Sequence, residues 1–139
     1  MNPQESDEFN STELGLQWQW HANYNQLWGM PTNNGCLRLY TADLTATDEA
    51  GKPLPIKSLW QAGNLLLQKT PAKDFTATAK IRFASKEDDQ YGGVIMMGRD
   101  YQALVVRRMG GNFLLQQLSC KDADLGGIET AKTLATFKP

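Results

Sequence analysis

Tryptophan is the residue type with the most specific chemistry in this 139-residue chain, which contains Trp18, Trp20, Trp28 and Trp60. An aromatic face can stack on the C–H face of a sugar ring, but aromatic side chains also fill protein cores. Trp18 and Trp20 lie on one side of an alternating run beside leucines, so we expect both in the core. Trp28 follows a polar loop and is the better candidate for a sugar-stacking platform.

The polar loop before Trp28 extends from His21 to Gln26. It is followed by the short apolar piece Leu27–Met30, which contains Trp28. The candidate carbohydrate-binding residues are Trp28, Tyr24, His21 and Trp60. His21 is the sole histidine of the chain, so neither a Ser-His-Asp nor a Cys-His arrangement for nucleophilic catalysis is predicted.

Acidic residues fall in short clusters within predicted loops, including Asp48-Glu49 and Glu87-Asp88-Asp89. A glycosidase needs two carboxylates on opposite sides of the scissile bond. Charge is the ordinary state of a loop, so no cluster is predicted to be catalytic. Calcium takes several oxygen ligands, and Glu87, Asp88 and Asp89 are the candidate residues for it. No other cofactor is predicted.

The two cysteines, Cys36 and Cys120, lie far apart in the sequence. Two cysteines and one histidine cannot supply the full ligand set of a structural zinc site. Free cysteine is among the most buried residue types, which favours two small buried residues in strands. One long-range disulfide is the alternative that the sequence leaves open.

The charge balance excludes several classes of partner. Fourteen Lys and Arg residues face fifteen Asp and Glu residues, for a net charge of -1. We therefore expect neither nucleic-acid binding nor attachment to a membrane surface, and no apolar run is long enough to span a bilayer. Residues 1–12 are polar and acidic, which predicts a linker without a signal peptide, followed by one domain over residues 13–139.

Alternation of apolar and polar residues dominates the rest of the chain and predicts strands rather than helices. The expected strands are 14–20, 36–40, 65–69, 75–83, 91–98, 101–109, 113–119 and 129–137. The clearest pattern is Phe75–Phe83, in which five apolar residues alternate with Thr, Lys and Arg. Residues 91–98 are apolar on both faces, as in a strand buried in the middle of a sandwich.

Turn signals between these strands predict how they connect. Gly110-Gly111-Asn112 is a hairpin turn, and residues 75–119 are expected to form an antiparallel meander. Pro53 and Pro55 argue against a central strand, so residues 41–58 are predicted to be a surface connection. Together these features predict an all-β, antiparallel β-sandwich.

Five motifs in order carry a resemblance to a known family. They are LQWQW (16–20), His21-Ala22-Asn23, GCLRL (35–39), AGNLLLQK (62–69) and DDQYGGVIMM (88–97). This order resembles the C-terminal β-sandwich domain of glycoside hydrolase family 43, the β-xylosidases and α-arabinofuranosidases, which reads W-x-W-N-H-N-P, G-x-L-R-L, A-R-N-x-L-x-Q-R and then A-G-L after an acidic turn. The chain departs from that pattern at Gly63, which stands where the family has arginine.

The resemblance implies a jelly-roll fold of concanavalin type and an accessory role in xylan or arabinan degradation. In the family the catalytic carboxylates lie on an N-terminal five-bladed propeller, which is the implied partner. We therefore expect this chain alone to hydrolyse nothing. Residues 21–26 are predicted to lie near the propeller interface, with a plant-type oligosaccharide as ligand. The alternatives are a free-standing, lectin-like glycan-binding sandwich and a purely structural interaction domain.

The family domain continues with more strands, so the chain is expected to be truncated after Phe137. An unpaired sheet edge is a template for pairing with another chain. We therefore expect self-association, with Met96, Val105 and Leu115 left partly uncovered.

Overall fold

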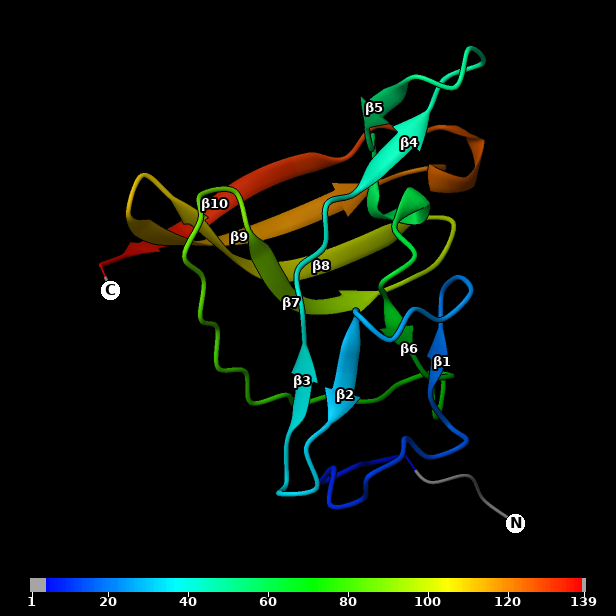
Figure 1. Cartoon of the computed structure of the whole chain (residues 1–139), viewed down its shortest axis with the longest axis vertical. Helices are drawn as coiled ribbons and strands as arrows, with labels where there is room; N and C mark the ends of the chain where they lie inside the picture. The colour runs from blue at the N-terminus through cyan, green and yellow to red at the C-terminus, as the bar shows by residue number, and fades with distance from the viewer. Residues whose placement is uncertain (1–4, 139) are drawn as a thin grey trace. The chain divides into compact units, whose positions relative to one another are not determined.

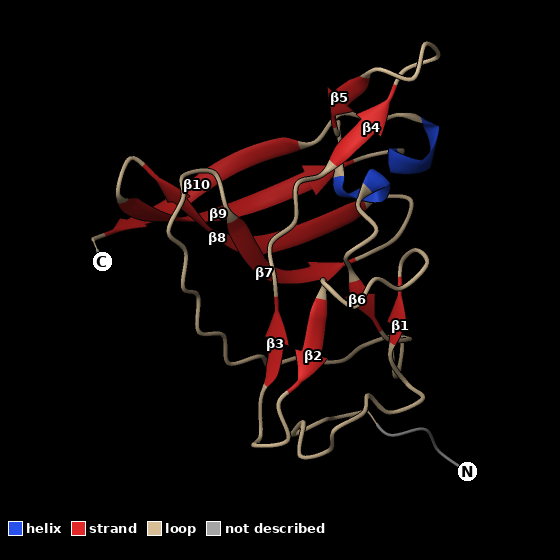
Figure 2. Cartoon of the chain, in the orientation of Figure 1, coloured by secondary structure: helices blue, strands red, loops and turns tan. Residues whose placement is uncertain are grey.

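The computed structural model describes residues 5–138, which form an antiparallel, all-β structure (Figure 1, Figure 2). The strands are β1 (Gln19–Trp20), β2 (Gly29–Pro31), β3 (Leu37–Leu39), β4 (Thr45–Thr47), β5 (Pro53–Pro55), β6 (Leu66–Leu67), β7 (Tyr91–Met96), β8 (Tyr101–Met109), β9 (Asn112–Cys120) and β10 (Thr130–Phe137), and the 3₁₀ turns are η1 (Leu59–Gln61) and η2 (Ala123–Leu125). Across the described residues there is no α-helix. None of their helical turns has the length and apolar character that crossing a bilayer requires.

The chain divides into two compact units. The first contains residues up to Asp43 together with Ala62–Ala77, and the second contains Leu44–Gln61 together with the residues from Thr78 onward. In the first unit β1 pairs with β6 and β2 pairs with β3, both antiparallel. The second unit contains the β4–β5 hairpin and the sheet formed by β7 to β10.

The strand predicted at residues 14–20 is much shorter in the first unit, where only β1 is paired. Leu16 is fully exposed, so the prediction that it faces the core is wrong, whereas Leu14, Trp18 and Trp20 are half-buried. Trp18 is half-buried: its Nε1 donates to Asp7 Oδ2 at 2.8 Å, and its ring packs on Phe9 at 5.7 Å between centroids. Residues of the predicted linker thus contact the domain, because a tryptophan N–H needs an acceptor when it leaves water.

The four-stranded sheet of the second unit is a meander in the order β10-β9-β8-β7. Each strand pairs with the next along the chain, with Tyr101 opposite Cys120 and Tyr91 opposite Arg107. Gly110 has a φ of 58° at the β8–β9 turn, a left-handed conformation that glycine adopts at little cost. The predicted meander is therefore confirmed over β7 to β9 and extends through β10.

One face of this sheet is the core of the second unit. Tyr101, Ala103 and Val105 are buried at alternate positions of β8, and Leu118 of β9 is fully buried. Val105 is only 4% exposed, so the expectation that it is left uncovered is wrong. The strand period places it on the packed face.

The opposite face of the sheet is largely open. Val94 of β7 lies directly opposite Leu104 of β8, and both are exposed, as is the neighbouring Met96 at 51%. Leu115 is half-buried. Because β7 is an edge strand of this sheet, the prediction that residues 91–98 lie in the middle of a sandwich is wrong for the described sheet.

Tyr101 ties three elements of the second unit together. Its hydroxyl accepts a hydrogen bond from the backbone N–H of Leu59 in η1, at 2.8 Å, and donates to the Glu129 carboxylate just before β10. Burial and the Glu129 hydrogen bond raise the pKa of Tyr101. The hydroxyl therefore satisfies a buried backbone donor that has no strand partner.

The two cysteines are free and lie in different surroundings. Cys120 at the end of β9 is buried, as predicted, and burial raises the pKa of its thiol. Cys36 is exposed in the turn before β3, so the prediction that both are buried strand residues is wrong. Cys36 lies just before β3, which begins at Leu37, and so is not part of the β2–β3 register.

Residues 41–58 contain the β4–β5 hairpin, which the sequence did not predict. The Asp48 Oδ1 accepts hydrogen bonds from the backbone N–H groups of Ala50 and Lys52, at 3.0 and 2.7 Å, and so closes the turn. In a two-stranded sheet both strands are edges, so Pro53 and Pro55 are tolerated.

The strand predicted at Phe75–Phe83 is wrong in this structure. The segment between β6 and β7 is drawn as a loop (Figure 2), and nearly all of its side chains are exposed. Within this segment, the backbone of residues 75–83 makes no hydrogen bond to another described residue. Alternation reports a preference for extended backbone, whereas a strand also needs a partner.

Candidate functional site

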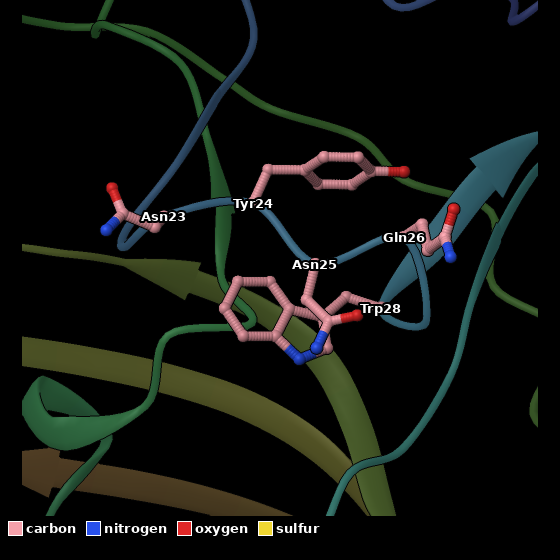
Figure 3. A pocket seen from close by; sticks show the side chains of 5 residues that line it. All are labelled: Asn23, Tyr24, Asn25, Gln26 and Trp28. Atoms are coloured by element: carbon pink, nitrogen blue, oxygen red, sulfur yellow. The ribbon is translucent and has the colours of Figure 1, made fainter.

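A surface pocket of the first unit is formed by the loop that connects β1 to β2 (Figure 3). The residues that line it are Asn23, Tyr24, Asn25, Gln26 and Trp28. Figure 3 shows all five side chains arising from one short stretch of backbone. The pocket thus combines two aromatic rings with three side-chain amides.

Backbone hydrogen bonds fix both ends of this loop. At its start, the His21 N–H donates to the Leu65 carbonyl at 2.9 Å, next to β6. At its end, the Trp28 N–H donates to the Asn25 carbonyl, and the Trp28 carbonyl accepts from the Tyr40 N–H, both at 2.9 Å. The loop is therefore held between two strand pairs of the first unit.

Trp20 contacts both aromatic rings that line the pocket. Trp20 lies 5.5 Å from Tyr24 and 5.6 Å from Trp28, measured between ring centroids. Such tilted contacts are typical of aromatic pairs in proteins. Trp28 is half-buried, whereas Tyr24 is 57% exposed, so Trp20 supports a ring that remains open to ligand.

Gly63 lies against the ring of Trp28. A Cβ added to Gly63 would come within 2.8 Å of Trp28 Cη2 and 3.1 Å of the Ala22 Cβ. A side chain at residue 63 would therefore displace the Trp28 ring.

The structure brings some of the predicted site residues together. Tyr24 and Trp28 line the pocket, and His21 is half-buried at the start of the same loop. Trp60 belongs to η1 of the second unit and does not line this pocket. The assignment of carbohydrate binding to these residues stays a prediction.

The sequence analysis did not single out the amides of Asn23, Asn25 and Gln26, which the structure adds to the pocket. Three amide residues within four positions, beside a tryptophan, are the signal that was available. It was weak because Asn and Gln are ordinary residues in loops.

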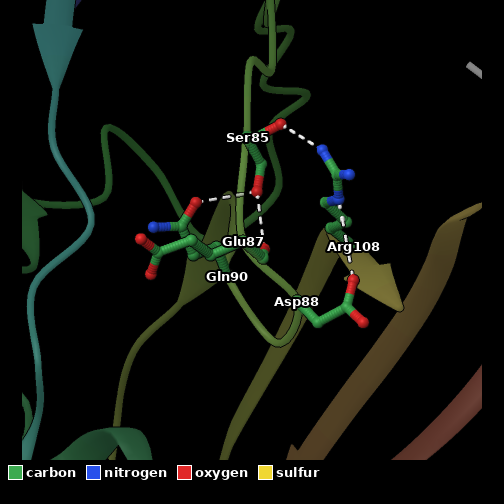
Figure 4. Close-up of polar contacts among 5 residues, drawn as sticks. All are labelled: Ser85, Glu87, Asp88, Gln90 and Arg108. Carbon is green, nitrogen blue, oxygen red and sulfur yellow. Dashed lines mark hydrogen bonds and ion pairs between the residues drawn. The ribbon is translucent and has the colours of Figure 1, made fainter. Parts of the chain in front are cut away.

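The predicted calcium residues lie in the turn before β7, where Figure 4 labels Glu87 and Asp88. Asp88 pairs with Arg108, with 3.6 Å between Oδ1 and Nε, and Asp89 pairs with Arg107. Glu87 contributes its carbonyl, which accepts from the Ser85 hydroxyl at 2.9 Å.

Among residues 5–138, no three His, Cys, Asp or Glu side chains are grouped so that they could hold a metal. The Ser85 hydroxyl also donates to Gln90 Oε1 at 2.7 Å, and Arg108 donates to the Ser85 carbonyl at 2.7 Å. The turn is thus held to β8 by arginine side chains. Calcium binding at Glu87, Asp88 and Asp89 stays a prediction.

These features define the chain as an antiparallel all-β domain with an aromatic and amide-lined loop. Residues 6–136 match the family described as the beta xylosidase C-terminal concanavalin A-like domain. The chain belongs to this family, which confirms the resemblance seen in the sequence and the β-sandwich class.

A curated relative, a beta-xylosidase of Formosa agariphila, is 27% identical over 115 residues, which cover 75% of this chain and 19% of that protein. The chain thus spans about a fifth of the length of the relative it matches. No solved structure matches the chain.

Proposed function

We propose that the chain is a non-catalytic accessory domain of a family 43 glycoside hydrolase, which packs on the catalytic propeller and contributes a loop to sugar binding. The observation that carries this proposal is the pocket of residues 23–28, in which aromatic rings and amides share one loop. Membership of the family supplies the parent enzyme class.

The chemistry of the pocket suits a plant-type oligosaccharide. A sugar presents C–H faces and hydroxyl groups together. The rings of Tyr24 and Trp28 suit the C–H faces, and each Asn or Gln amide offers both a donor and an acceptor to hydroxyls. The ligand class is therefore a neutral xylose- or arabinose-containing oligosaccharide.

The open face of the second unit's sheet supports packing on the catalytic domain. Val94, Met96 and Leu104 are each exposed on that face. Contiguous apolar surface marks interaction sites on soluble proteins. A propeller surface that covers these side chains would remove them from water.

Sugar binding is tested by titrating the chain with xylo- and arabino-oligosaccharides in a calorimeter. We expect measurable binding that Tyr24→Ala weakens about tenfold, in line with the stacking energy of one aromatic ring. Tyr40→Ala is the matched control, since Tyr40 is exposed but does not line the pocket. No binding by the chain would leave the purely structural role as the better assignment.

The accessory role is tested by co-expressing the chain with the propeller domain encoded in the same gene. We expect one complex in size-exclusion chromatography and separation of the two parts when Val94 and Leu104 are replaced by threonine and glutamine. A reading frame without a propeller, combined with sugar binding by the chain alone, would favour a free-standing lectin-like domain.

A further inference from the structure

Asn34 and Gly35 lie in the turn of the β2–β3 hairpin in the first unit. The turn is closed by the Thr32 N–H, which donates to the Cys36 carbonyl at 3.0 Å. Gly35 has a φ of 79°, a left-handed conformation that favours a residue without a Cβ. Asn34 is the sole asparagine of the chain that precedes a glycine.

Both residues of this pair are open to solvent. Asn34 and Gly35 are exposed, and the Gly35 N–H makes no backbone hydrogen bond to another described residue. Because glycine has no side chain, nothing on residue 35 shields its nitrogen from the preceding carboxamide. The Gly35 nitrogen is therefore free to approach Asn34 Cγ.

The Asn34 carboxamide is held by Thr32 across the turn. The Thr32 hydroxyl donates to Asn34 Oδ1, and it also lies 2.9 Å from the Cys36 carbonyl. The hydroxyl has one proton, which these two acceptors share. When this proton points to Oδ1, it polarises the carboxamide and stabilises negative charge on that oxygen.

We propose that Asn34 is a site of self-modification, at which the turn converts the side-chain amide to an aspartyl or isoaspartyl carboxylate with assistance from the Thr32 hydroxyl. Every reacting atom other than those of water belongs to residues 34 and 35. This modification is independent of the sugar pocket.

The reaction balances with water as the one co-reactant. The Gly35 nitrogen attacks Asn34 Cγ, so that an N–Cγ bond forms while the Cγ–Nδ2 bond breaks. The amide nitrogen leaves as ammonia and takes the proton that Gly35 loses. Water then opens the cyclic imide at either carbonyl, which gives aspartate or isoaspartate. No atom changes its oxidation state.

The products change the turn in two ways. Each places a carboxylate where a neutral amide stood, which adds one negative charge to a chain of net charge -1. The isoaspartyl product also lengthens the backbone by a methylene inside the turn that Thr32 and Cys36 close. Since β2 and β3 pair over only three residues, we expect their amides to exchange faster after modification.

The test incubates the whole chain in mildly alkaline buffer and follows it by fragment-ion mass spectrometry. We expect the mass shift of amide-to-acid conversion at Asn34, an isoaspartyl fraction and ammonia in equal amount. Asn23, Asn25 and Asn64 are internal controls, because each precedes a residue with a side chain.

Thr32→Val isolates the role of the hydroxyl. It should slow the conversion about fivefold in the folded chain, which corresponds to one hydrogen bond. Thr32→Ser keeps the hydroxyl and should react at the parent rate. In urea, the parent and Thr32→Val should react equally, because only the fold makes the contact with Asn34. Thr45→Val is the matched control, at an exposed threonine of β4.

Three results would overturn the proposal. The first is an Asn34 that stays unmodified in the folded chain while the urea-unfolded chain reacts. The second is an equal rate for the folded parent and folded Thr32→Val, which would remove the role of the hydroxyl. The third is conversion of Asn23, Asn25 or Asn64 at the rate of Asn34.

Discussion

The ring of Trp28 occupies its position because residue 63 is a glycine without a side chain. Any side chain at Gly63 would meet the far edge of the Trp28 indole, which leans into that space. The ring that we assign to sugar stacking therefore occupies space that a side chain at residue 63 would need.

Gly63→Ala is predicted to displace the Trp28 ring, to weaken oligosaccharide binding and to cost about 1–3 kcal/mol of unfolding free energy through overpacking. The free energy is measured by urea denaturation, and binding by calorimetry. Gly92→Ala is the control, because a Cβ there would meet only the Phe83 ring, at an ordinary 3.8 Å. Equal effects of the two substitutions would show that Trp28 does not depend on residue 63.

Tyr101→Phe is predicted to destabilise the chain by about 1–3 kcal/mol, because it leaves the buried Leu59 N–H without an acceptor. Tyr40→Phe, at an exposed tyrosine, should change the free energy of unfolding by less than about 0.5 kcal/mol. Urea denaturation of both variants measures the difference. If Tyr40→Phe lowered the free energy of unfolding and Tyr101→Phe did not, the stabilising role of the Tyr101–Leu59 hydrogen bond would be contradicted.

The stabilising contact of the Tyr101 hydroxyl should also make the free energy of unfolding depend on alkaline pH. Burial, together with the Glu129 hydrogen bond, raises the pKa of Tyr101 above its usual value of 10.0, and burial also raises that of Tyr91. The folded state then holds these protons more tightly than the unfolded state. The resulting stability is fully present below pH 10.0 and is lost as the pH rises above it.

The urea concentration at the unfolding midpoint should therefore decrease as the pH rises above 10.0. The decrease should be less steep for Tyr101→Phe. A midpoint that rises with pH in this range would contradict the assigned direction.

At the scale of the elements, β8 and β9 should be the most stable strands, since each is paired on both sides. Their amides should exchange with solvent orders of magnitude more slowly than those of the β4–β5 hairpin, which has no third strand. Hydrogen exchange measured by NMR tests this ranking. Slow exchange throughout β4 and β5 would contradict it.

The sequence predicted β8, β9 and β10 closely because each pairs with its neighbour along the chain. Local alternation and a glycine turn were then sufficient information. β1 instead pairs with the distant β6, and only two residues of the predicted strand are paired. Alternation does not show whether a distant segment pairs with a strand, or over how many residues. For the same reason Phe75–Phe83 was predicted to be a strand.

The sequence predicted the aromatic residues of the pocket but not its amide residues. Tyr24 and Trp28 were found because aromatic residues in polar loops are uncommon. Asn25 and the neighbouring amides were missed because loops ordinarily contain such residues, although all three lie in the predicted polar loop 21–26. Trp60 was grouped with them on composition, although it belongs to the other unit.

At the scale of the whole molecule, the chain alone is predicted not to hydrolyse aryl xylosides or arabinosides. No carboxylate lines the aromatic pocket, and hydrolysis needs two. A chromogenic assay of the pure chain should give the rate of buffer, unchanged by Asp89→Asn. Turnover that Asp89→Asn abolishes would contradict this prediction.

The isolated chain is also predicted to self-associate through the open face of the β7–β10 sheet. Val94, Met96 and Leu104 expose apolar area that nothing in the chain's own sheet covers. Sedimentation velocity should show mass rising with concentration, and Leu104→Gln with Val94→Thr should lower it. A parent chain that is monomeric at every concentration would contradict the prediction.

The contrast between the two thiols makes the native chain a selectively reactive molecule. A maleimide dye should couple to the exposed Cys36, in the same unit as the aromatic loop, while Cys120 is shielded by burial and by its raised pKa. Fluorescence can then follow ligand addition without any substitution. Uptake of a second dye would mark the opening of β9, so that counting labels against denaturant gives an unfolding curve for the sheet.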